Sequence, residues 1–189
     1  TSCYMELLEA GLAYQPNQKE NKPLKSMSQL VVQVTREAGR KKNPRVTALF
    51  SLHSAHMVLA RGKEETGISR KLPQAERERL RTLVQTFERP KDTQLIIRTN
   101  AAGVPEHALT AEYARLLERY RHILHMADTR PVFSILEKAE SGYVTMLKEY
   151  AKNGIVLRTD SKDIVDEIQN TADICCTENE RAKKPKAVG

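Results

Sequence analysis

The hydrophobic residues of the chain recur with two different periods. Short runs in which apolar and polar residues alternate, or in which β-branched residues cluster, predict β-strands. Longer runs in which apolar residues recur every three or four positions predict amphipathic α-helices. The expected strands span residues 3–6, 29–36, 45–51, 56–60, 95–99 and 131–136, with a short extended piece at 11–16. This mixture of strands and helices indicates an α+β fold.

Two helices are expected in the middle of the chain. Pro73 can open a helix that runs to about Phe87, because proline is favoured in the first helical turn. Thr110 is a suitable N-cap for a longer helix. The apolar stripe of this longer helix predicts that it packs along most of its length. The stripe consists of Tyr113, Leu116, Leu117, Tyr120, Ile123, Leu124 and Ala127.

The last part of the chain has the pattern of a strand-helix segment followed by a tail. The expected elements are a helix over residues 141–151, a strand over 155–157 and a helix over about 160–168. Acidic residues at the start of the last helix, such as Asp160 and Asp163, are interpreted as capping and solvated groups, because helix N-termini favour acids. The polar, lysine-rich sequence from residue 171 onward predicts a disordered basic tail.

Positive charge is concentrated in one window. The formal net charge is +7, and residues 19–45 hold eight lysines and arginines against two glutamates. A local basic stretch is typical of nucleic-acid-binding surfaces, although an acidic protein or an anionic membrane would also match it. The basic turn at residues 38–44 lies between two expected strands. Short strands joined by such a turn predict part of an OB-type β-barrel, a fold that binds single-stranded nucleic acid.

The cysteines and the hydropathy limit the classes of protein to consider. Cys3, Cys175 and Cys176 are odd in number, and two are adjacent, so we expect neither a disulfide framework nor a zinc site. This usage fits a reducing compartment, and no signal peptide or membrane span is visible. We therefore predict a cytoplasmic protein without a membrane partner. Because the chain opens on Thr1 within an apolar segment, we also expect it to be part of a larger protein.

Arg98 and Thr99 follow the apolar residues of one expected strand. Strand ends are common positions for binding groups, because the strand holds them rigidly. A guanidinium group beside a small hydroxyl suits a phosphate, since the first offers planar donors and the second a further hydrogen bond. The alternative interpretation is a solvated arginine at a strand end, followed by a turn residue.

Several short motifs occur in an order and spacing that resemble the ribonuclease E/G family of bacterial endoribonucleases. They are QVTRE at 33–37, PRVTA at 44–48, GISRK at 67–71 and IRT at 97–99. The resemblance runs from about residue 3 to 170 and covers only the middle of a family member. It implies four parts. They are a partial OB-type RNA-binding barrel (1–50), a small α/β 5′-sensor-like domain (51–136), the start of an RNase H-like segment (137–170) and the tail (171–189).

The resemblance implies a site for the 5′-monophosphate of RNA. Arg98 and Thr99 match the residues that hold the phosphate in the family, and Val58 matches one that lies against the terminal nucleotide. Ser54 stands near the position of a family glycine, so its side chain could crowd the pocket.

Further residues match the RNA path of the family. Arg70 corresponds to an arginine near that path, and Lys71 replaces a second arginine, which keeps the charge but loses the bidentate fork. Tyr4 and Tyr14 keep the ten-residue spacing of two base-stacking aromatics, and Lys42 falls where the family has a lysine. From its turn-rich setting we expect Tyr14 to be the more exposed tyrosine, whereas Tyr4 could equally be a core residue.

The sequence thus predicts single-stranded RNA binding with recognition of the 5′-monophosphate, as the non-catalytic part of an endoribonuclease of RNA processing and decay. The family's two catalytic aspartates and their Mg²⁺ have no equivalent here, so we expect no catalytic residue and no metal in this chain. Self-association would use regions outside it. The alternative is a non-enzymatic interaction module that binds rRNA or an acidic protein. A third reading, a metal hydrolase built on His122 and His125, lacks a third ligand.

Overall fold

The computed structural model describes residues 2–18, 23–40 and 42–138. The chain divides into two compact units, Thr1–Leu136 and Glu137–Gly189. The elements expected at 141–151, 155–157 and 160–168, and the tail from 171, lie outside the described residues. The first unit combines two sheets with two α-helices, and this combination confirms the α+β class. The finer assignments to an OB-type barrel and a 5′-sensor domain stay predictions.

The first residues of the unit form a small two-stranded sheet beside a short helix. Strand β1 (Gln33–Arg36) pairs antiparallel with β2 (Arg45–Thr47), and a bridge between Gly39 and Lys42 closes the basic turn. The expected hairpin is therefore confirmed, although both strands are shorter than predicted. Residues 3–6 contribute a single bridge, from Tyr4 to Arg45, in place of a strand. The 3-10 helix η1 (Leu7–Leu12), which the sequence did not suggest, follows.

The larger sheet has the strand order β3-β4-β6-β5. Its strands are β3 (Ser51–His53), β4 (Met57–Arg61), β5 (Thr66–Ile68) and β6 (Thr93–Ile97). Neighbouring strands are antiparallel, except that β5 and β6 run parallel. Alternate residues of β4 and β6 are buried, because successive side chains point to opposite faces of a sheet.

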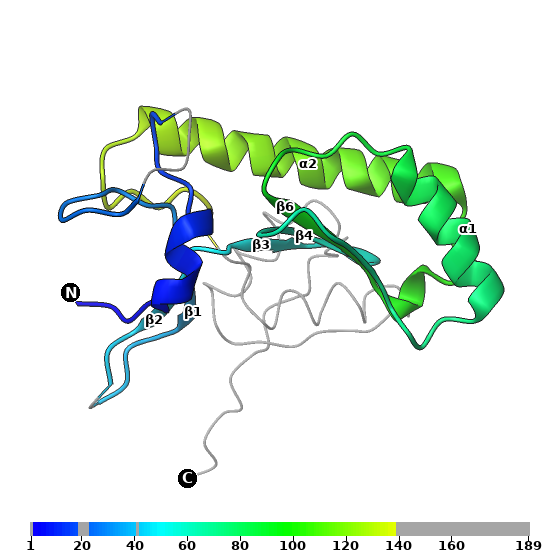
Figure 1. Cartoon of the computed structure of the whole chain (residues 1–189), viewed down its shortest axis with the longest axis horizontal. Coiled ribbons are helices and arrows are strands. Elements are labelled where there is room, and N and C mark those ends of the chain that lie inside the picture. Colours follow the sequence, from blue (N-terminus) through cyan, green and yellow to red (C-terminus); the bar gives the residue numbers. More distant parts are fainter. Residues whose placement is uncertain (1, 19–22, 41, 139–189) are drawn as a thin grey trace, which may run out of the picture. The chain divides into compact units, whose positions relative to one another are not determined.

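Two helices pack against the buried face of this sheet, and Figure 1 shows the longer helix lying along the sheet. Helix α1 (Gln74–Gln85) contacts β5, and α2 (Glu106–Thr129) contacts β3 and β4. They cover the core made by β4, β6 and their neighbours. Among the described residues, no helix is both long and apolar enough to span a membrane.

The apolar stripe predicted for α2 is confirmed. Five of its residues are buried and two are partly buried against the core. The helix begins one turn earlier than expected, because Pro105 stands at its N-terminus and fixes the backbone there. Thr110 is consequently not an N-cap, and its hydroxyl donates to the carbonyl of Glu106 at 2.9 Å inside the first turn. Leu109 and Glu112 extend the buried face.

The expected strands differ from the observed ones at three further places. Residues 131–136 form turns, with Phe133 in the left-handed region at φ 67° and the Ser134 hydroxyl bonded to the Pro131 carbonyl at 2.7 Å. Such a backbone cannot continue a pleated strand. Conversely, Thr66–Ile68 is strand β5, which was not among the expected strands. Thr99 does not extend β6, because it begins the 3-10 turn η2 (Thr99–Ala101).

Candidate nucleic-acid interface

The parallel pairing of β5 and β6 places the ends of both strands at the same edge of the sheet. Ile68 pairs with Ile97, and the backbone N–H of Ser69 donates to the Ile97 carbonyl at 3.0 Å. Ser69 Oγ then lies 2.9 Å from Thr99 Oγ1. The motifs GISRK and IRT, thirty residues apart in sequence, therefore meet at this edge. We call Ser69, Arg70, Lys71, Arg98 and Thr99 the strand-end cluster.

The turn between β3 and β4 lies against this cluster. The backbone N–H of Arg98 donates to the carbonyl of His56 at 2.8 Å, and Nη1 of Arg98 donates to the carbonyl of Ser54 at 3.3 Å. Asn100 Nδ2 donates to the Ala55 carbonyl. Ser54 bonds within its own turn, since its Oγ donates to the Met57 carbonyl at 3.0 Å. Ser54 and Arg98, named from the sequence, are thus direct neighbours.

Val58 lies on the sheet face opposite the helices. It pairs with Ile96 across β4 and β6, and both side chains are half-buried. Arg98 has an extended backbone and follows Ile96 by two positions. Because side chains alternate along an extended chain, the side chains of Val58, Ile96 and Arg98 belong to the same face.

A buried glutamate of α2 holds the β3–β4 turn, and it was not among the residues predicted from the sequence. Glu112 accepts hydrogen bonds from the backbone N–H of His56 at 2.8 Å and pairs with Nδ1 of His56 at 2.6 Å. Burial acts to raise the pKa of Glu112, but the hydrogen bonds from His56 outweigh it and keep the pKa below its ordinary value. The signal available in the sequence was the position of Glu112 beside the apolar stripe of the helix. A carboxylate on the buried face of a helix is seldom left without a partner, so its position could have indicated a bonded group.

Tyr4 is more exposed than Tyr14, which reverses the expected order of the two tyrosines. The Tyr4 side chain is 59% exposed, and the Arg45 guanidinium lies 6.0 Å from its ring centroid. Tyr14 is half-buried, and its hydroxyl donates to Asp128 at 2.9 Å. Burial and this hydrogen bond raise the pKa of Tyr14 to about 12. The expectation that Tyr14 is the more exposed tyrosine was wrong, because a carboxylate 114 residues away holds its hydroxyl.

The remaining basic and metal-binding candidates lie at the surface. Lys42 is exposed in the basic turn, and Arg70 and Lys71 are exposed after β5. His122 and His125 are both exposed on α2. Within the part of the chain that the structure describes, no three histidine, cysteine or acidic side chains gather as a metal site.

Comparison with known proteins identifies relatives of one family. The model of the ribonuclease E/G family matches residues 51–186. Ribonuclease E of Escherichia coli is 26% identical over 141 residues, which are 74% of this chain and 13% of the relative. Ribonuclease E of Synechocystis is 29% identical over 127 residues, or 67% of this chain and 19% of the relative. A chloroplastic ribonuclease E/G-like protein of Arabidopsis thaliana is 31% identical over 113 residues, or 59% of this chain and 11% of the relative.

The chain spans less than a fifth of the length of each of these relatives. The family match covers well over half of the chain, and it includes the two motifs that meet in the strand-end cluster. The resemblance that the motifs indicated is thereby confirmed, and the chain belongs to the ribonuclease E/G family.

Proposed function

We propose that this chain binds single-stranded RNA and recognises the 5′-monophosphate of that RNA at the strand-end cluster. The observation that carries the proposal is the meeting of Ser69, Arg98 and Thr99 at the ends of the parallel strands, with 2.9 Å between the two hydroxyls. The chain would act as the non-catalytic part of an endoribonuclease of RNA processing and decay. Family membership and the names of the relatives support the RNA partner.

Arg98 has donors to spare for a phosphate. A guanidinium carries five N–H donors, and the hydrogen bonds of this side chain include one of 3.3 Å to the Ser54 carbonyl. In the hydroxyl pair of Ser69 and Thr99, one group donates to the other, so the accepting hydroxyl can donate to a phosphate oxygen. Each hydrogen bond to the charged phosphate would contribute about 1.5–3 kcal/mol.

The other residues named from the sequence have supporting roles in the proposal. Val58 would form the wall beside the terminal nucleotide, with Ser54 at the rim. Arg70 and Lys71 would contact the RNA backbone. In the small sheet, Lys42 would do the same, and Tyr4 would stack on a base. The Tyr14 ring is half-buried, so it has less surface for stacking, and we assign this role to Tyr4 first.

The catalytic aspartates and Mg²⁺ of the complete enzyme would lie in regions that this chain does not include. The second candidate function, a module that binds rRNA or an acidic protein, is favoured by one observation. Arg36, Arg40 and Lys42 are all exposed on or beside the basic turn. Such a surface would bind a polyanion without reading its end.

The test is the fluorescence anisotropy of a labelled RNA of about ten nucleotides, compared between a 5′-monophosphate and a 5′-hydroxyl form. We expect a preference for the phosphate of at least about tenfold, which is the contribution of one charge-assisted hydrogen bond. Arg98→Ala removes this preference, whereas Arg121→Ala, at an exposed position of α2, keeps it. Salt-sensitive binding without any preference would support the second candidate function.

A further inference from the structure

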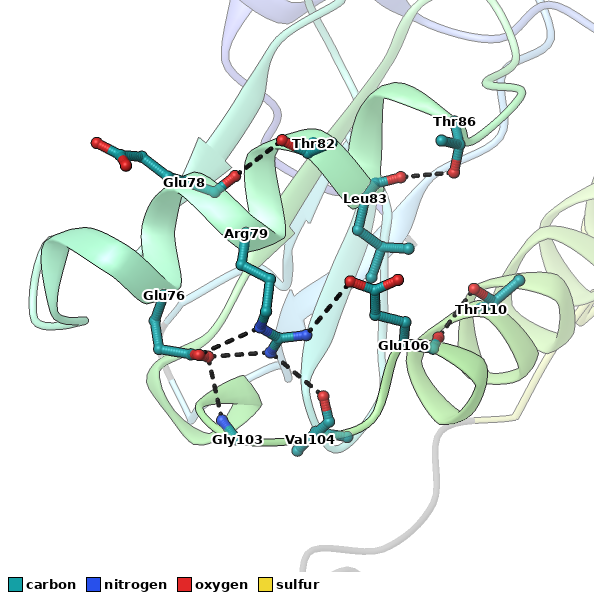
Figure 2. Close-up of polar contacts among 10 residues, drawn as sticks. All are labelled: Glu76, Glu78, Arg79, Thr82, Leu83, Thr86, Gly103, Val104, Glu106 and Thr110. Atoms are coloured by element: carbon teal, nitrogen blue, oxygen red, sulfur yellow. Dashed lines mark hydrogen bonds and ion pairs between the residues drawn. The ribbon is translucent and has the colours of Figure 1, made fainter.

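The three arginines of α1 differ in their partners. Arg79 donates to Glu76 at 2.9 Å and to the Val104 carbonyl at 3.2 Å, and it lies 3.9 Å from Glu106. Figure 2 shows these contacts joining α1 to the segment that leads into α2. Arg79 therefore has a structural role.

Arg77 and Arg81 instead line a groove between α1 and β5. The groove has a volume of about 630 Å³, within the range of ligand-binding sites, and we call it the arginine groove. Arg70 and Arg89 also line it, and its apolar wall includes Ile68 and Val84. No acidic side chain is among its lining residues.

The charge of these four arginines is not neutralised by carboxylates within the part of the chain that the structure describes. None of them forms an ion pair there, in contrast to Arg79. Arg77 donates to Gln74, and Arg89 donates to the Glu65 carbonyl at 3.0 Å. Nε of Arg77 is buried and has no hydrogen-bond partner within the described part of the chain. A buried donor without a partner is unfavourable, so the guanidinium of Arg77 has unmet hydrogen-bonding capacity beside the groove.

The arginine groove adjoins the strand-end cluster. Arg70 lines the groove and belongs to the cluster, and it follows Ser69, which contacts Thr99 at 2.9 Å. At the other end of β5, Arg89 is held to the residue just before the strand. Positive groups therefore line the groove along β5 and reach the proposed phosphate site.

We infer that the arginine groove binds the backbone of single-stranded RNA, independently of the state of the RNA 5′ end. The inference rests on the proposed RNA-binding function and adds a second contact region to it. Planar guanidinium groups match phosphates in geometry, and their charge would provide sequence-independent affinity. Phe87 also lines the groove, so apolar and aromatic surface lies beside the cations, an arrangement typical of single-strand binding sites. An acidic peptide would use the positive charge of the groove but would not require its aromatic surface, so the combination of the two favours RNA.

The experiment measures the binding of a ten-nucleotide RNA, with and without a 5′-monophosphate, at several salt concentrations. The test variant is Arg77→Ala/Arg81→Ala, and the matched control is Arg115→Ala/Arg121→Ala, which removes the same charge from exposed positions of α2. We expect the test variant to bind both RNAs at least about tenfold more weakly and to keep the phosphate preference. The slope of log K against log salt should fall by about 1.4, or 0.7 for each lost phosphate contact. The control should change affinity by less than about twofold.

Each other result overturns the inference in a distinguishable way. RNA binding of the test variant within about twofold of wild type would exclude the groove and leave 5′-phosphate recognition intact. Loss of the phosphate preference in this variant would mean that the groove acts only through the strand-end cluster. A decaglutamate peptide that competes better than RNA, and depends on Arg81, would point to an acidic protein partner. No RNA binding by the wild-type chain would overturn the proposed function as well.

A second variant guards against misfolding of the first. Because Arg81 is exposed, Arg81→Glu serves as a second variant that leaves the core intact.

Discussion

Nδ1 of His56 lies 2.6 Å from Oε2 of Glu112, so the N-terminal part of α2 is bonded directly to the turn that borders the proposed phosphate site. Glu112 also accepts a hydrogen bond from the His56 backbone N–H at 2.8 Å. The same turn accepts two hydrogen bonds from Arg98. The position of Arg98 therefore depends on a carboxylate that does not itself belong to the strand-end cluster.

The first prediction concerns this link. Glu112→Gln removes the charge and one acceptor while keeping the shape, so the donors of His56 lose a partner. We expect the free energy of unfolding to fall by about 1–3 kcal/mol, measured by urea denaturation. The preference for 5′-phosphorylated RNA should fall too, because the turn no longer fixes Arg98. Glu118→Gln, at an exposed position of the same helix, is the control. Equal stability of the Glu112→Gln variant and wild type would contradict the prediction.

The second prediction is a pH dependence. The pKa of Glu112 in the folded chain is below its ordinary value of 4.5. The unfolded chain therefore binds a proton at Glu112 more readily than the folded chain does, and stability falls as pH decreases. The contribution is complete above about pH 4.5 and is lost as pH falls through the lower folded pKa. Wild type should lose stability below this pH more steeply than Glu112→Gln. Parallel curves for the two proteins would show that Glu112 does not cause the dependence.

The two helices show which features the sequence could predict. The stripe of α2 was predicted because a helix that packs along its length must repeat apolar residues at the helical period. The start of α2 was predicted too late, because Thr110 is a residue type that often caps helices. The helix in fact begins one turn earlier, directly after Pro105. Strand β5 was missed because it has three residues, and its pairing partner is about thirty residues away. Local pattern alone cannot indicate such a pairing.

The candidate site was predictable only in part. Arg98 and Thr99 stood out as polar residues after a buried strand, and the structure brings Ser69 to Thr99 through parallel pairing that the sequence did not reveal. The apolar residues around Phe133 suggested a strand, but the chain turns there. Tyr14 looked exposed because its partner Asp128 comes from the far end of α2. In each case the missing information was a tertiary contact.

A third prediction separates the two tyrosines. Tyr4→Ala should weaken RNA binding by about 1–3 kcal/mol, the contribution of one stacked base. Tyr14→Phe keeps the ring and removes the hydroxyl bonded to Asp128, so RNA affinity should stay unchanged while stability falls by about 0.5–1.5 kcal/mol. Anisotropy and urea denaturation measure the two quantities. A larger loss of RNA affinity in Tyr14→Phe than in Tyr4→Ala would assign the RNA contact to Tyr14.

The same tyrosine gives a fourth prediction at high pH. The pKa of Tyr14 is raised to about 12 from 10.0, so the folded chain keeps its proton where the unfolded chain loses it. Stability from this group is therefore complete below about pH 10 and decreases as pH rises toward 12. Tyr14→Phe should remove one late-ionising phenol from the ultraviolet absorbance titration. An unchanged titration curve between these pH values would contradict the assignment.

The last prediction tests the hydroxyl pair of Ser69 and Thr99. If one hydroxyl donates to the other and the second donates to the phosphate, either removal should break the same chain of hydrogen bonds. Ser69→Ala and Thr99→Val should therefore each reduce the preference for 5′-phosphorylated RNA, by up to about tenfold. The double variant should lose little more than the stronger single variant, since coupled residues are not additive. Additive losses would show that the two hydroxyls contact the phosphate separately, and no loss in either variant would leave recognition to Arg98 alone.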